Sequence, residues 1–109
     1  MEKPIQVLIV GKNETIVLLL KRLVNRFKGL HPIVAFCDKS AIDSIQCQPI
    51  ELVILSSGLL EDCENRIKEK ALAKNQGIKI IVHFGGGSGL LKCEISEAFG
   101  KEIEWVEAL

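Results

Sequence analysis

The residue types that could do chemistry in this sequence are four cysteines, a histidine near the end of an apolar run, and a glycine-rich segment. Cys37, Cys47, Cys63 and Cys93 lie far apart and form neither a CxxC pair nor a cluster with histidine. Zinc sites and redox motifs need ligands at short spacings. The even number of cysteines leaves disulfides open. Because no secretion signal is evident, we expect reduced and mostly buried thiols, with no metal and no cofactor.

The glycine-rich segment at 85–89 follows an apolar run and precedes a helical pattern, where free backbone N–H groups can hold phosphate. It matches neither GxGxxG nor GxxxxGK[ST], so a permissive strand-to-helix connection is favoured over an anion cradle. Ligands of open α/β sheets bind at the carboxyl ends of strands. The candidate anion-binding residues are therefore Lys12, Ser57, Gly86 and Gly87. The other interpretation of Lys12 is a structural pairing with a neighbouring carboxylate.

Two further residues have more than one interpretation. His83 lies near the end of a buried apolar run, and no nucleophile is evident beside it. We therefore interpret it as a structural histidine with a satisfied ring, rather than as a general base. Trp105, the only tryptophan, lies in the last apolar run. It fits equally well as a core residue or as the anchor of an interface.

Length and composition predict one small globular domain over residues 1–109. Hydrophobic residues make up 48% of the 109, and 14 Lys and Arg balance 14 Asp and Glu. Zero net charge argues against a nucleic-acid protein and against a polybasic membrane-surface protein. The longest unbroken apolar run, 16–20, is far too short to span a membrane, and no secretory signal is visible. We expect a cytoplasmic protein.

Short β-like runs alternate with helical patterns along the chain, and these elements must position the candidate residues. Strands are expected at 5–10, 32–37, 51–55, 78–84 and 103–106. Helices are expected between 13 and 29, between 38 and 49, at about 60–73 and through 90–99. Alternation with short connections predicts a parallel sheet with helices on both faces and right-handed crossovers.

The order and spacing of these elements resemble a response-regulator receiver domain, which has a flavodoxin-like fold with strand order 2-1-3-4-5. The similarity rests on residues 7–23, 40–56, 80–84 and 105–109, and therefore covers nearly the whole chain. It implies a three-layer α/β sandwich with a five-stranded parallel sheet. Here the sheet would carry four helices, because no fifth helix follows the last strand.

The sequence departs from the receiver pattern where that family carries its chemistry. The resemblance implies an acidic pair, a phospho-accepting aspartate, a hydroxyl residue and a lysine after the first, third, fourth and fifth strands. The residues at these positions are Gly11 and Lys12, Ser56, Phe84 and Glu107. Phosphoryl transfer to a carboxylate needs that carboxylate and a divalent cation, and a serine is a weak nucleophile without a base. We expect no enzymatic activity.

The expected function is that of a pseudo-receiver, a non-phosphorylatable protein-interaction module in two-component-type signal transduction. The missing fifth helix should expose apolar sheet surface on the side of the first helix, which favours a dimer or a protein partner. Truncation of a longer chain would explain the missing helix equally well. The candidate interface residues are Leu90, Leu91, Ile95, Phe99, Ile103 and Trp105. The alternative function is a small flavodoxin-like domain that binds an anion or nucleotide.

Overall fold

The computed structural model describes residues 4–27, 29–56, 58–83 and 88–100, with only the helical backbone at 88–90. The strands are β1 (Ile5–Val10), β2 (Leu30–Ala35), β3 (Ile50–Ser56) and β4 (Lys79–His83). The helices are α1 (Glu14–Asn25), α2 (Asp38–Cys47), α3 (Glu61–Lys74) and α4 (Ser88–Phe99). Each strand and helix expected before residue 100 is confirmed, with small differences in its bounds. Within these described ranges, no helix has both the length and the apolar character needed to span a bilayer.

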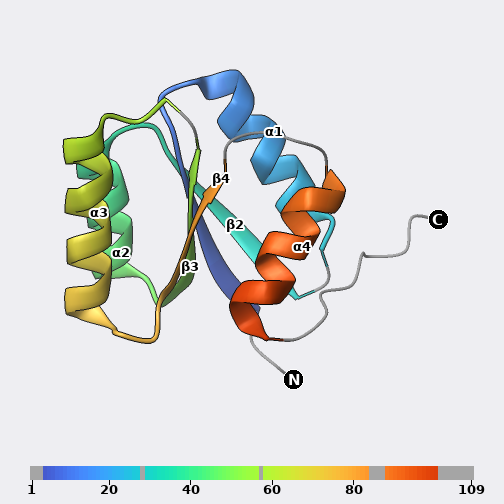
Figure 1. Cartoon of the computed structure of the whole chain (residues 1–109). Coiled ribbons are helices and arrows are strands. Elements are labelled where there is room, and N and C mark those ends of the chain that lie inside the picture. Colours follow the sequence, from blue (N-terminus) through green and yellow to red (C-terminus); the bar gives the residue numbers. More distant parts are fainter. Residues whose placement is uncertain (1–3, 28, 57, 84–87, 101–109) are drawn as a thin grey trace.

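The four strands form one parallel sheet in the order β2-β1-β3-β4. Helices α1 and α4 cover one face, and α2 and α3 cover the other (Figure 1). Val7 and Ile9 pack toward α1 and α4, whereas Leu8 and Val10 pack toward α2 and α3. All four side chains are fully buried, because a parallel sheet is covered on both sides. The expected three-layer α/β sandwich is therefore confirmed.

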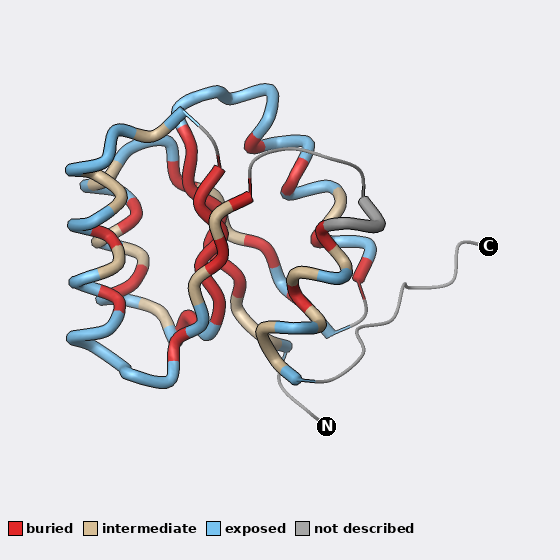
Figure 2. The backbone as a smooth tube through the Cα atoms, viewed as in Figure 1, coloured by how far each residue is buried: buried red, intermediate tan, exposed pale blue. Residues whose placement is uncertain are grey.

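Each helix buries one stripe of side chains and leaves the rest to solvent (Figure 2). On α1 the buried stripe is Val17, Leu20 and Val24, at three- and four-residue steps, whereas the apolar Ile16 and Leu19 are exposed. Asn13 begins this helix, because its side-chain oxygen accepts a hydrogen bond from the backbone N–H of Ile16 at 3.1 Å. Local chemistry thus determines where α1 begins and which side faces the sheet.

The second strand lies two residues earlier than expected, at Leu30–Ala35 instead of 32–37. The reason is the start of α2, which Cys37 caps: its Sγ accepts a hydrogen bond from the backbone N–H of Ser40 at 3.5 Å. The helix expected between 38 and 49 did not include Cys37 as its cap, because cysteine is not among the preferred capping residues. The thiol therefore lies at the helix terminus and is exposed, in contrast to the mostly buried thiols that we expected.

Helix α4 corrects the expectation of an uncovered sheet face. Leu91 and Ile95 of this helix are fully buried in the same cluster as Val17 of α1 and Ile81 of β4. Helix α4 therefore lies on the α1 face and covers β4 together with the middle of the sheet (Figure 1). The predicted apolar surface next to α1 is occupied by the chain's own fourth helix.

The expected fifth strand, 103–106, lies outside the described residues, so the order 2-1-3-4-5 is established only for its first four strands. The position of α4 bears on where such a strand can lie. The chain moves across the sheet in one direction from β2 to β3 through α2, and from β3 to β4 through α3. Both helices lie on the same face of the sheet, opposite to α4. A parallel strand beside β4 that followed α4 would therefore need a left-handed crossover, which about 2% of such connections show.

Candidate functional site

The carboxyl ends of β1 and β3 meet at Gly11 and Ser56, two of the positions where the receiver pattern expects acids. Gly11 is buried, and its backbone N–H donates to the Ala35 carbonyl at 3.2 Å. A Cβ atom on residue 11 would lie 2.1 Å from Ser56 Oγ and 2.7 Å from Val17 Cγ2. Ser56 is itself only 3% exposed. The Ser56 hydroxyl and the Val17 methyl group thus occupy the space that a side chain at position 11 would need.

Lys12, the other residue of the expected acidic pair, is exposed. It makes no ion pair with any described residue, which does not support the interpretation of Lys12 as the partner of a neighbouring carboxylate. The side chain of its neighbour Asn13 is engaged in capping α1. Lys12 therefore remains a solvated cation beside the end of β1.

These residues do not fit the Mg²⁺ ion that the receiver fold implies. Mg²⁺ prefers octahedral oxygen ligands, typically one or two carboxylates with waters. Gly11 supplies no side chain, Lys12 is a cation, and Ser56 offers one buried hydroxyl. Among the described residues, no group of three or more His, Cys, Asp or Glu side chains could hold a metal ion.

Several candidate residues lie outside the described part of the chain. They include Ser57, Gly86 and Gly87 of the possible anion site, Phe84 and Glu107 of the altered receiver pattern, and Ile103 and Trp105 of the possible interface. Leu90 belongs to the helical backbone of α4, and its side chain is not described.

The remaining interface candidates lie on α4, and two of them are core residues. Leu91 and Ile95 are fully buried against the sheet, so neither can present its side chain to a partner. Phe99 is partly buried and packs against the same cluster. The helical period that suggested an apolar docking face on α4 instead marks the stripe that binds this helix to β4.

The most specific polar contact near the strand ends joins His83 and Glu94. His83 closes β4 and is 4% exposed, and its Nδ1 lies 2.5 Å from Glu94 Oε1 on α4. The interpretation of His83 as a structural histidine with a satisfied ring agrees with this contact. Glu94 was not among the sequence candidates, because one glutamate in a helical pattern carries no signal of its partner across a loop.

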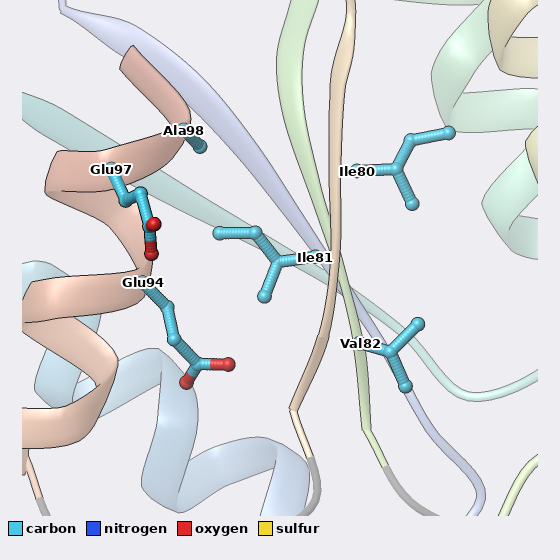
Figure 3. A pocket seen from close by; sticks show the side chains of 6 residues that line it. All are labelled: Ile80, Ile81, Val82, Glu94, Glu97 and Ala98. Atoms are coloured by element: carbon cyan, nitrogen blue, oxygen red, sulfur yellow. The ribbon is translucent and has the colours of Figure 1, made fainter. Parts of the chain in front are cut away.

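A groove of about 320 Å³ runs between the outer edge of β4 and α4, lined by Ile80, Ile81, Val82, Glu94, Glu97 and Ala98. Ile81 points toward α4 and the two glutamates, whereas Ile80 and Val82 point to the other side of the strand (Figure 3). Three consecutive residues line the groove although their side chains alternate in direction. The groove therefore follows the edge of the strand itself.

No protein-family model matches this sequence, and no curated protein matches it at a significant level. Among solved structures, it is similar to a response regulator receiver protein from Pseudomonas putida, with TM-score 0.65 and 17% identity over 90% of this chain and 82% of that chain. The signal receiver domain of an HD domain-containing protein from Pseudomonas fluorescens Pf-5 gives TM-score 0.63 and 16% identity, over 91% and 96%. The lactose-specific IIB component domain of the phosphoenolpyruvate:carbohydrate phosphotransferase system from Streptococcus pneumoniae gives 0.59 and 17%, over 90% and 93%.

These similarities establish the fold of the chain, which is the α/β flavodoxin-like fold found in receiver domains. They confirm at that level the resemblance inferred from the order of the elements. A phosphotransferase-system domain also shares the arrangement, so the fold alone does not assign a function. The function therefore depends on the side chains that this fold carries at the strand ends and at the β4 edge.

Proposed function

We propose that this chain is a receiver-like domain that acts in signal transduction by binding a protein partner, without being phosphorylated. The observation that carries the proposal is the close approach of Gly11 and Ser56. A carboxylate at position 11 would require neighbouring side chains to move, because its Cβ atom alone would lie 2.1 Å from Ser56 Oγ and 2.7 Å from Val17 Cγ2. This packing of Gly11 against Ser56, together with the absence of an acidic side chain at either position, supports the proposal of a domain that is not phosphorylated.

The structural similarity to receiver domains supports a role in signal transduction. Two structural neighbours are described as a response regulator receiver protein and a signal receiver domain. A domain that keeps their fold but lacks a usable acidic cluster retains a surface for contacts with other proteins. Such a role requires no catalytic residue and places the domain in the cytoplasm, beside other signalling proteins.

The alternative function, binding of an anion or nucleotide at the strand ends, has less support. Of its candidate residues only Lys12 lies in the described part of the chain, where it is exposed and next to a capping asparagine. One solvated lysine holds an anion weakly, because water screens its charge. We therefore retain the interaction role.

The test is incubation with acetyl phosphate and Mg²⁺, followed by intact-mass measurement. We expect no mass increase by a phosphoryl group, and no thermal shift with beryllofluoride and Mg²⁺. A receiver domain with its acidic residues intact, treated in parallel, supplies the positive control. A phosphoryl adduct on the folded chain, whether on Ser56 or on another residue, would falsify the proposal. A thermal shift with nucleotides or flavins in the same screen would instead favour the alternative function.

A further inference from the structure

We propose that the outer edge of β4 binds an extended, basic peptide segment of a partner protein as an added strand. This inference rests on the proposed interaction role and names the site and the chemistry of the partner. Strand addition to an exposed sheet edge gains affinity from backbone hydrogen bonds and specificity from pockets for alternate side chains. The β4 edge provides both features.

The first feature is an accessible backbone edge. β4 is the last strand of the described sheet, and its pairing is with β3 alone. In a strand paired on one side, every second residue directs its N–H and C=O away from the sheet. Ile80, Ile81 and Val82 all line the groove, so no other described strand covers this edge. An incoming strand can therefore reach these outward groups.

The two edges of the sheet differ in how they resist strand addition. The other edge strand, β2, carries Pro32 at its centre, paired with Val7 of β1. Proline has no N–H to offer and protects an edge from pairing. β4 has no proline, and its three central residues are the β-favouring Ile80, Ile81 and Val82. The β4 edge is thus the one that is open to a new strand.

The second feature is an acidic side of the groove, the acidic wall, formed by Glu94 and Glu97 of α4. Glu94 and Glu97 are the only charged residues among the described residues that line the groove. His83 holds the Glu94 carboxylate at 2.5 Å, which fixes one end of this wall. Glu97 is exposed and makes no ion pair within the described residues. A lysine or arginine on the added strand, next to Ile81, would meet these carboxylates.

The chain's own residues after α4 are a poor occupant of this edge. A parallel strand there needs the rare left-handed crossover, because α4 lies on the α1 face. An antiparallel strand would have to start beside His83, whereas α4 ends at the opposite end of β4 (Figure 1). The segment 101–109 also carries three glutamates against one lysine, and its net negative charge would be repelled by Glu94 and Glu97.

A second copy of the chain is disfavoured for a similar reason. Antiparallel pairing of two β4 edges would bring both α4 helices to the same face of a continuous sheet. Glu94 and Glu97 of one copy would then face the same two residues of the other. Like charges placed opposite each other destabilise such a pair. A partner segment with basic side chains meets no such repulsion.

The test uses the full chain and a fluorescent eight-residue peptide in which lysine alternates with valine and threonine. We expect binding in a fluorescence polarisation titration, with amide shift changes concentrated on 79–83 and α4 in an NMR titration. Glu97→Lys should weaken binding roughly fivefold, about the upper limit for one exposed ion pair. Glu69→Lys, an equal charge change at an exposed residue of α3, should leave binding unchanged. An N-methylated version of the peptide should not bind, because it lacks the backbone donors.

Three outcomes would overturn the inference: no binding of the lysine peptide, equal binding of a peptide with glutamate in place of lysine, or shift changes centred away from β4. Concentration-dependent dimerisation through β4 would show that a second copy of the chain occupies the edge. Protection of the 79–83 amides from hydrogen exchange that is lost on deletion of 101–109 would show that the chain's own last residues occupy it. Phosphorylation by acetyl phosphate would instead contradict the proposed function, whatever the peptide result. The phosphorylation assay thus tests the proposed function, and the peptide titration tests the site at β4.

Discussion

Gly11 and Ser56 approach so closely at the ends of β1 and β3 that a Cβ atom on residue 11 would lie 2.1 Å from the Ser56 hydroxyl oxygen. The receiver pattern has acidic residues at both positions, and here the two residues are in packed contact. A side chain at position 11 would collide with the Ser56 hydroxyl unless one of the two moved.

Gly11→Ala should destabilise the domain by roughly 1–3 kcal/mol, the usual cost of forcing an added methyl group into a packed interior. The new Cβ would collide with both Ser56 Oγ and Val17 Cγ2. Urea denaturation followed by circular dichroism measures the change in the free energy of unfolding. In the Ser56→Ala background the cost of Gly11→Ala should be smaller, because residues in contact are not additive. Full additivity of the two changes would contradict this account of the contact.

Glu94→Ala should destabilise the fold, because it removes the partner of a histidine that is 4% exposed. Leaving a buried polar group unsatisfied costs about 1–3 kcal/mol. The matched control is Glu97→Ala, one turn further along α4 and exposed, which should change the free energy of unfolding by less than about 0.5 kcal/mol. Equal effects of the two substitutions in a denaturant titration would show that the contact with His83 contributes nothing.

Lys74 connects the end of α3 to the end of α2. Its Nζ donates to the carbonyl oxygens of Ile45, of Gln46 at 2.8 Å and of Gln48 at 3.1 Å. A cation at a helix C-terminus satisfies carbonyl groups that have no partner within the helix. Lys74→Met keeps most of the apolar stem and should cost about 1 kcal/mol.

The control for this substitution is Lys70→Met, on the preceding turn of α3, where the side chain is exposed. It should leave the free energy of unfolding nearly unchanged. Thermal unfolding at two salt concentrations gives a further check, because salt screens the attraction between the ammonium group and the helix end. A loss in Lys70→Met as large as in Lys74→Met would contradict a specific role of Lys74.

Cys37 should be more reactive at neutral pH than an ordinary cysteine thiol. The Ser40 hydroxyl, 3.4 Å from Cys37 Sγ, and the Ser40 backbone N–H lower the pKa of this exposed thiol. Since the thiolate is the nucleophile, alkylation of Cys37 by iodoacetamide should reach half of its limiting rate at a lower pH than alkylation of a free cysteine in a short unstructured peptide. Peptide mass spectrometry over a pH series measures these rates.

Ser40→Ala should raise the pKa of Cys37 and move its alkylation profile to higher pH, because it removes the largest stabilising contact of the thiolate. The linkage to stability has a definite sign. The pKa of Cys37 is lower in the folded state, so the thiolate stabilises the fold above the unfolded pKa, and this stabilisation is lost as the pH falls through the folded pKa. Identical pH profiles for Cys37 in the two proteins would count against the role of Ser40.

Sequence alone determined the alternation of strands and helices, the parallel sheet and the absence of acids at the receiver positions. These features depend on residue type and on short-range periodicity. The sequence did not predict that Cys37 caps α2, because cysteine is not among the residues that usually cap helices.

Tertiary structure decided the face that α4 covers, the contact between Gly11 and Ser56, and the pairing of His83 with Glu94. Each of these joins residues of different elements, whose packing no local pattern specifies. The apolar period of α4 predicted a helix with one buried side, but an apolar stripe is the same whether it covers its own sheet or a partner. Only the three-dimensional packing showed that Leu91 and Ile95 belong to the core, and that a groove lies between α4 and the edge of β4.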